Sequence, residues 1–374
     1  LEIVIVALFL FHILFVNVML GGSTLTLFYE VLGRKRPELD KLAREIGKTI
    51  TVSKSLAVVL GVGPLLAINV LYTIYFYSAN ALTGMAWISI VPLLSIAFLL
   101  TYLHKYTWDR LAENKGLHIA IGAMATGLFW LIPLIFLGNI NLMLFPERWT
   151  EVHGFLSALT LPNVLPRYLH FLLASMALTG LGGVAWFGRR EYPVEATLPG
   201  FDRPRLRRTF YSITFGATLL QAVVGSLVYF TLPVKGITGY MTLVILLGVV
   251  AAVAFMTLLW KEIIGPDQRI GRFFAPIVFL LTTTVTCMAY GRHLYRETSL
   301  VDHRQAMLVR TADFQRASAA AAAGLLPQED TTPLGQKVFE TVCAGCHAVD
   351  KTLVGPPLTE IATLYAGKPA GIVA

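Results

Sequence analysis

Long apolar stretches constrain this chain more than any other feature of its sequence. A helix needs about 20 mostly apolar residues to cross the hydrocarbon core of a bilayer. Eight stretches reach that length, near residues 3–32, 49–77, 84–104, 117–145, 166–188, 208–232, 238–262 and 272–294. With 56% hydrophobic and only 14% charged residues, the chain does not fit a soluble surface. We therefore predict an all-α integral membrane protein with a bundle of about eight transmembrane helices.

The positions of the charges predict how the bundle is oriented. A net charge of +8 could suggest nucleic-acid binding, but Lys and Arg gather in alternate loops. Eighteen of them lie in segments 33–48, 105–116, 188–208 and 261–272, whereas the other loops hold only Arg148, Arg167 and Lys235. By the positive-inside rule the basic loops face the cytoplasm. We expect no nucleic-acid partner, contact with membrane lipid, and a multi-pass protein of the bacterial cytoplasmic membrane with both termini on the periplasmic side.

The composition changes from apolar to polar after residue 295. An alanine-rich run, ASAAAAAGLL, is followed by PQEDTTPLG, in which Pro327 and Pro333 oppose the continuation of a helix. We therefore predict three parts. They are the transmembrane bundle over 1–295, a surface helix and linker over 296–334, with the linker at 327–334, and a small extramembrane α domain over 335–374.

The small domain contains TVCAGCHAVD, in which Cys343, Cys346 and His347 form a Cys-x-x-Cys-His run. In this motif the two thiols attach a haem covalently and the imidazole binds its iron. A redox dithiol or half of a zinc site would be the alternative, but the chain has three cysteines and no second pair for zinc. The segment GQKVFETVCAGCHAVDKTLVGPPL resembles a class I cytochrome c. We predict one covalent haem c, with thioethers from Cys343 and Cys346 and with His347 on the iron.

The haem c motif also bears on topology and on the length of the chain. Haem is attached to this motif outside the cytoplasm, which is the side where the basic loops place the C-terminus. Cytochromes of this class usually supply a later Met as distal ligand, yet all nine Met residues precede Cys343. We expect the chain to continue beyond Ala374, because forty residues form a small core for a haem. His303 and Met307 are a less favoured source of the distal ligand.

Histidines inside apolar stretches are candidate functional residues, because polar groups are costly in hydrocarbon. His12 lies within the first stretch and His170 near the outer end of the fifth. Imidazole is the usual protein ligand of b-type haem, so we predict both as haem b ligands. Met241, at a depth similar to His170, is predicted as the opposite ligand, with plain packing an equal alternative. His104 and His118 flank an inner loop and are predicted to be interfacial side chains.

Several motifs together resemble subunit I of the cytochrome bd quinol oxidases. FHILFVNVMLG contains His12 and is similar to the first-helix motif whose histidine ligates a haem of the oxygen-reducing site. LPNVLPRYLHFLLASMALTG contains His170 and is similar to the fifth-helix motif whose histidine ligates the low-spin haem b. TWDRL and AYGRHLY match further motifs in the same order, so the resemblance covers about 1–295. It implies one or two b haems, a quinone and a second membrane subunit.

Departures from the family pattern argue against oxygen reduction. By the family's spacing, Ser89, Ala97 and Thr282 stand where the oxidases carry glutamates. The long quinol-binding loop between the sixth and seventh helices shrinks to PVKGITG. Because oxygen reduction consumes protons, the missing acids make an oxidase unfavourable. His293 replaces the family's Gln in AYGRHLY, and we predict that it shares the second haem b iron with His12.

We therefore expect a haem-containing electron-transfer subunit of a respiratory complex. Its b haems and haem c would move electrons between the quinone pool and periplasmic redox proteins, with the redox chemistry belonging to the cofactors. Two alternatives stay open. One is a bd-like terminal oxidase fed through haem c, and the other is a non-catalytic membrane anchor that carries haem c for a periplasmic enzyme.

Overall fold

The computed structural model describes residues 2–323 and 333–367, and all regular structure in these two ranges is helical. The chain divides into two compact units, Leu1–Asp302 and His303–Ala374. The predicted linker at 327–334 lies outside the described residues except for its last two positions. The protein is an all-α membrane protein, because the helices of the first unit are long and apolar enough to cross a bilayer repeatedly.

The first unit consists of long helices joined by short helical turns. The long helices are α1 (Glu2–Gly33), α2 (Pro37–Leu71), α4 (Met85–Tyr106), α5 (Lys115–Leu142), α7 (Val164–Phe187), α9 (Arg203–Phe230), α10 (Gly239–Ile264) and α11 (Phe274–Ser299). The short elements are α3 (Thr73–Thr83), η1 (Pro146–Glu151), α6 (Phe155–Ala158), α8 (Val194–Thr197), η2 (Val234–Gly236) and η3 (Asp267–Arg269). The predicted apolar stretches are therefore confirmed as helices, with one exception.

The exception is the stretch 49–77, which was predicted as one span. The structure instead bends the chain by 109° between α2 and α3. The break lies at Tyr72, whose backbone leaves the helical region and whose ring is buried. The Tyr72 hydroxyl donates to Glu297 of α11, so the bend is held by a contact between distant parts of the sequence. Hydropathy alone could not locate it.

The second unit begins within α12 (Val301–Ala322), which lies inside the predicted surface segment and exposes most of its residues. It continues with α13 (Leu334–Val338), a π-helical turn η4 (Phe339–Cys343) and α14 (Leu358–Leu364). The bundle's last helix, α11, ends four residues beyond the predicted end at 295, and the compact units divide between Asp302 and His303.

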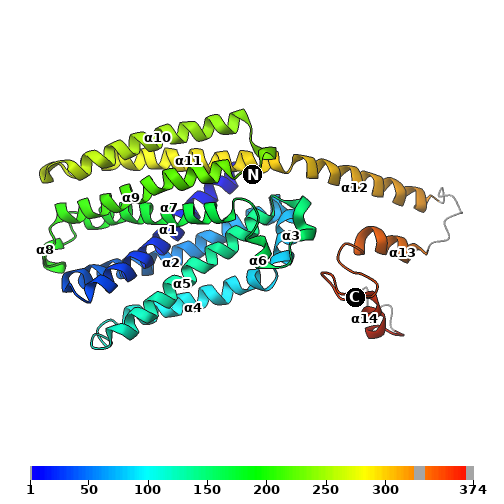
Figure 1. Ribbon diagram of the computed structural model, residues 1–374, viewed down its shortest axis with the longest axis horizontal. Helices are drawn as coiled ribbons and strands as arrows, with labels where there is room; N and C mark the ends of the chain where they lie inside the picture. Colours follow the sequence, from blue (N-terminus) through cyan, green and yellow to red (C-terminus); the bar gives the residue numbers. More distant parts are fainter. Residues whose placement is uncertain (1, 324–332, 368–374) are drawn as a thin grey trace. The chain divides into compact units, whose positions relative to one another are not determined.

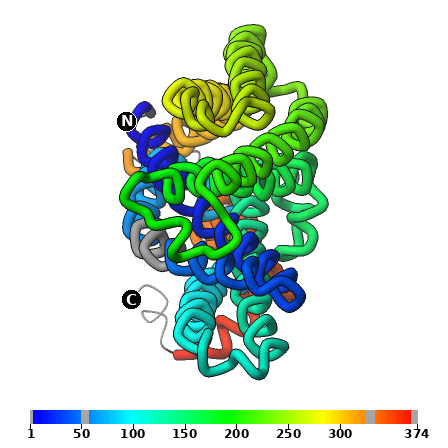
Figure 2. The backbone as a smooth tube through the Cα atoms, turned by 90° about the vertical axis from the view of Figure 1, so that its left-hand side faces the viewer, coloured from blue at the N-terminus to red at the C-terminus, as the bar shows by residue number. Residues whose placement is uncertain are grey.

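Neighbouring helices in the bundle follow a simple order (Figures 1 and 2). α10 and α11 pair at one edge, and α9 and α7 follow in turn. α1 is central and contacts α2, α5 and α7, while α4 packs on α5 at the other edge. All four basic loops lie at the same end of the bundle, which we call the basic end. The start of α1 and the end of α11 lie at the opposite end.

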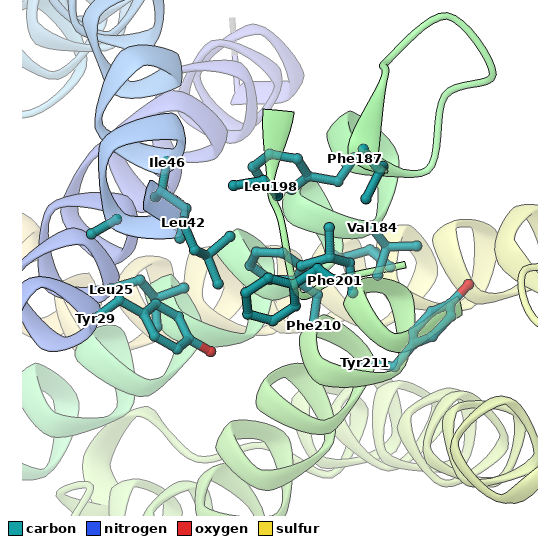
Figure 3. Close-up of a cluster of buried hydrophobic side chains, with 14 of the residues drawn as sticks. Leu25, Tyr29, Leu42, Ile46, Val184, Phe187, Leu198, Phe201, Phe210 and Tyr211 are labelled. Atoms are coloured by element: carbon teal, nitrogen blue, oxygen red, sulfur yellow. The ribbon is translucent and has the colours of Figure 1, made fainter. Parts of the chain in front are cut away.

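Apolar side chains close the basic end between α1, α2, α7 and α9 (Figure 3). Leu42 of α2, Leu198 of the 188–202 loop and Phe210 of α9 are fully or almost fully buried there. The hydroxyl of Tyr192 in the same loop donates to Glu45 of α2 at 3.0 Å. Burial, together with this carboxylate, raises the pKa of Tyr192. The loop is therefore fastened to the helix ends by both packing and a hydrogen bond.

Small residues set the spacing between the helices. A Cβ atom on Gly21 of α1 would lie 2.3 Å from the backbone oxygen of Ser175 in α7. A Cβ atom on Gly183 of α7 would lie 2.4 Å from the ring of Phe210 in α9. Close approach through small residues is the usual basis of helix association in lipid, where burial of apolar surface gives little driving force between helices.

We predict that Gly183→Val destabilises the bundle, because its side chain would collide with Phe210. Overpacking of this kind costs about 1–3 kcal/mol of unfolding free energy. Gly182→Val is the matched control, since a Cβ atom at Gly182 meets no atom within 4 Å. Thermal unfolding in detergent should show a lower midpoint for Gly183→Val alone. Equal midpoints for the two variants would contradict the prediction.

Candidate functional site

The Cys-x-x-Cys-His run forms a compact turn in the second unit. The backbone N–H groups of Cys346 and His347 donate to the carbonyl of Cys343 at 3.0 and 2.8 Å, which places the two thiols and the imidazole on one turn. Both thiols are free. The N–H groups of Val354 and Gly355 donate to the carbonyl of Cys346, so the following loop folds back over the motif.

The orientation of His347 fits iron ligation. Its Nδ1 lies 2.7 Å from the carbonyl oxygen of Pro356, which can only accept, so Nδ1 carries the proton. The lone pair of the neutral ring is then on Nε2. A ring N–H that donates to a backbone carbonyl is the usual support of a metal-binding histidine. Gly355 lies against the ring, since a Cβ atom there would be 2.2 Å from Cε1.

The apolar side chains of the second unit also fit a haem. Several stay exposed within 333–367, namely Leu334, Val338, Val342, Val349, Leu353, Val354 and Leu364. Exposed apolar side chains clustered in so short a segment indicate a surface that binds an apolar group. A porphyrin joined to Cys343 and Cys346 would supply such a group.

Residues 333–373 match the family model described as cytochrome c. This segment is a cytochrome c domain. The prediction of a haem c electron-transfer role is confirmed at this level, and the match begins two residues before the predicted start of the domain. A search of curated proteins and a search of solved structures found no match to the chain.

His12 has a similar arrangement in the membrane bundle. Its Nδ1 lies 3.0 Å from the carbonyl oxygen of Ala57 in α2, so Nδ1 carries the proton and, in the neutral ring, Nε2 holds the lone pair. A Cβ atom on Gly61 would lie 2.9 Å from the ring. The glycine therefore makes room for an imidazole between α1 and α2 and leaves one nitrogen able to bind a metal.

His170 lies one turn beyond Arg167 on α7, and both side chains carry a buried atom without a partner. His170 Nδ1 and Arg167 Nη1 have no hydrogen-bond partner among the described residues. A Cβ atom on Gly225 of α9 would lie 3.3 Å from the His170 ring. Unpaired buried polar atoms are rare in folded proteins. This pair, with a glycine beside the ring, fits a haem whose iron meets the imidazole and whose carboxylates meet the guanidinium.

The predicted partner ligands are buried, but the structure does not test their roles. Met241 is 1% exposed at the start of α10, in an apolar cluster that also contains Tyr295. His293 is buried on α11 with its ring stacked near that of Tyr290. The pairing of Met241 with His170 and of His293 with His12 stays a prediction.

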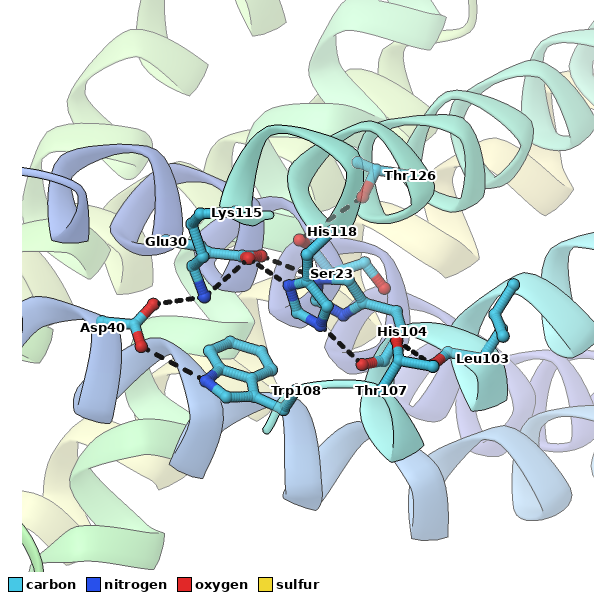
Figure 4. Close-up of polar contacts among 10 residues, drawn as sticks. All are labelled: Ser23, Glu30, Asp40, Leu103, His104, Thr107, Trp108, Lys115, His118 and Thr126. Atoms are coloured by element: carbon cyan, nitrogen blue, oxygen red, sulfur yellow. Dashed lines mark hydrogen bonds and ion pairs between the residues drawn. The ribbon is translucent and has the colours of Figure 1, made fainter. Parts of the chain in front are cut away.

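The prediction for His104 and His118 was wrong, because both are buried. They converge with Glu30 of α1, whose side chain has no exposed surface (Figure 4). His104 Nε2 lies 2.7 Å from Glu30 Oε2, and His118 Nδ1 is in hydrogen-bond contact with Glu30 Oε1. Lys115 bridges Glu30 and Asp40 at 3.0 and 2.6 Å. The basic end thus contains a buried ionic cluster that the sequence analysis missed.

The sequence did hold a weak signal for this cluster. Glu30 is an acid on an otherwise apolar stretch, and an ionisable residue in such a position needs a partner. His104 and His118 are 14 residues apart across a loop, so the two helices that hold them can bring them to one level. Only the packing of the helices shows that Glu30 of α1 meets both residues.

We predict that Cys343→Ala combined with Cys346→Ala abolishes covalent haem, because no thioether can form. The matched control is Cys287→Ala, since Cys287 lies on α11 of the first unit. Mass spectrometry of the denatured chain should show the added haem mass in the wild type and in Cys287→Ala only. A haem adduct in the double variant would contradict the assignment of the thiols.

Proposed function

We propose that this protein is a membrane electron-transfer subunit of a respiratory complex. Its transmembrane bundle binds one or two b haems, and the cytochrome c domain carries the covalent haem c. Electrons move between the quinone pool and a periplasmic redox protein through these groups. The cofactors supply the redox chemistry, and the chain supplies axial ligands, charge partners and placement.

The observation that supports haem b most directly is the pair His170 and Arg167. Both buried atoms lack partners among the described residues, on one face of one helix, and both would gain partners from one haem. His12 adds a second imidazole, whose Nδ1 donates its proton to the backbone carbonyl of Ala57. The likeness of the motifs around His12 and His170 to bd oxidase subunit I agrees with this assignment.

The proposed orientation is supported by charge and by helix position. The basic loops gather at one end of the bundle, which we place on the cytoplasmic side. His170 is near the start of α7 and His293 near the end of α11, both toward the other end. Both termini and the cytochrome c domain would then be periplasmic, where haem c is attached. A second membrane subunit is proposed as a partner.

We predict that the purified chain contains haem b in addition to one haem c. A pyridine haemochrome assay separates the two, and a reduced-minus-oxidised spectrum should show both bands. Haem c without haem b would contradict the proposal and would favour the anchor alternative. Cyanide-sensitive oxygen uptake by the purified protein would instead favour the oxidase alternative.

We predict that His170→Ala removes one haem b per chain, because the imidazole is its iron ligand. Arg167→Gln should lower haem b retention through loss of a carboxylate partner. Arg148→Gln is the control, since Arg148 is exposed in η1. Haem b is counted relative to haem c, which measures the amount of chain, and the thermal unfolding midpoint in detergent reports on folding of the bundle. An unchanged ratio in His170→Ala would exclude this ligand.

A further inference from the structure

The Glu30–His104–His118 cluster brings ligand atoms from three helices together. One atom from each residue lies within 4.8 Å of the others, and all three residues are buried. We propose that this cluster binds one divalent transition-metal ion of the Zn²⁺ type, through His104 Nε2, His118 Nδ1 and the Glu30 carboxylate. Two imidazoles and one carboxylate are a common donor set for such ions. The site is separate from the proposed haem b sites and does not depend on them.

Hydrogen bonding selects the nitrogen that His118 offers. Its Nε2 lies 2.7 Å from the backbone oxygen of His104, which can only accept, so Nε2 carries a proton. In the neutral ring the lone pair is then on Nδ1, which faces Glu30. Nδ1 can therefore approach the Glu30 carboxylate only with a second proton or a metal ion between the two atoms. The N–H to carbonyl bond is also the usual support of a metal-binding histidine.

The second imidazole places another ring nitrogen where the same metal ion could bind it. The rings of His104 and His118 stack with centroids 4.1 Å apart and planes 24° from parallel. One metal ion could accept both lone pairs and also neutralise Glu30.

Outer contacts hold Glu30 in position. Lys115 Nζ lies 3.0 Å from Glu30 Oε1 and 2.6 Å from Asp40 Oδ1, so its charge is shared between two carboxylates. The Trp108 indole donates to Asp40 at 3.2 Å, and its ring lies beneath the Lys115 ammonium at 4.2 Å. Ligating carboxylates are commonly fixed by such hydrogen bonds, so Lys115 fits the role of a positioning residue.

A cavity beside His104, lined by both apolar and polar side chains, leaves space next to the site. Its wall includes Thr26 and Thr101, together with Gly122 of α5. A Cβ atom on Gly122 would lie 2.8 Å from His104 Nε2. The glycine therefore leaves room beside the proposed metal-binding nitrogen. Space for a fourth ligand is what a three-residue metal site requires.

The test measures metal bound to the full, haem-loaded chain purified without a histidine tag. After treatment with a chelator, the protein is loaded with Zn²⁺ or Co²⁺ and its metal content is determined by mass spectrometry. We expect one ion per chain, with visible ligand-field bands for Co²⁺. Lys115→Gln removes an outer contact and should weaken metal binding by roughly 10- to 100-fold. Glu30→Gln and His118→Ala each remove a ligand and should weaken metal binding by more than that.

A pair of glycine variants tests the site without removing a ligand. Gly122→Ala would place a methyl group beside His104 Nε2 and should weaken metal binding. Gly127→Ala on the same helix should bind like the wild type, since a Cβ atom there meets no atom within 4 Å. The thermal unfolding midpoint in detergent reports on folding of the bundle in every variant. A wild-type chain that takes up neither ion overturns the proposal, as does unchanged affinity in folded Glu30→Gln or His118→Ala.

Discussion

The buried carboxylate of Glu30 is the constraint on which the basic end of the bundle depends. A charge without exposed surface is stable only when other groups pair with it, and here those groups come from two further helices. Through Lys115 and Asp40 the same network reaches α2. Apolar packing gives little driving force between helices in lipid, so these polar contacts fix the register of α1 against α2, α4 and α5.

In both units, imidazole rings pack closely against glycine residues. Each of four imidazoles lies beside a glycine whose Cβ atom would press on the ring, in the pairs His12–Gly61, His104–Gly122, His170–Gly225 and His347–Gly355. In His12 and His347 the Nδ1 proton is donated to a backbone carbonyl. A glycine gives the ring space, and the carbonyl fixes its tautomer. Together they present one nitrogen for metal binding.

The two ends of the bundle thus differ in chemistry. The end opposite the basic loops holds His170 with Arg167, whose buried Nη1 has no hydrogen-bond partner among the described residues, which suits an anionic cofactor such as haem. The basic end holds a buried acid that contacts two imidazoles, which suits a metal ion. The proposed electron transfer and the proposed metal site therefore use different groups, and each can fail without the other.

Sequence alone determined the helices, the basic loops and the cytochrome c domain, because these depend on hydropathy, charge and a contiguous motif. The bend at Tyr72 and the burial of His104 and His118 depend on contacts between helices distant in sequence. His104 and His118 flank a basic loop, so their positions in the sequence favoured an interface. Only the tertiary structure brings Glu30 into contact with both, since no local pattern records which face of α1 meets these two residues.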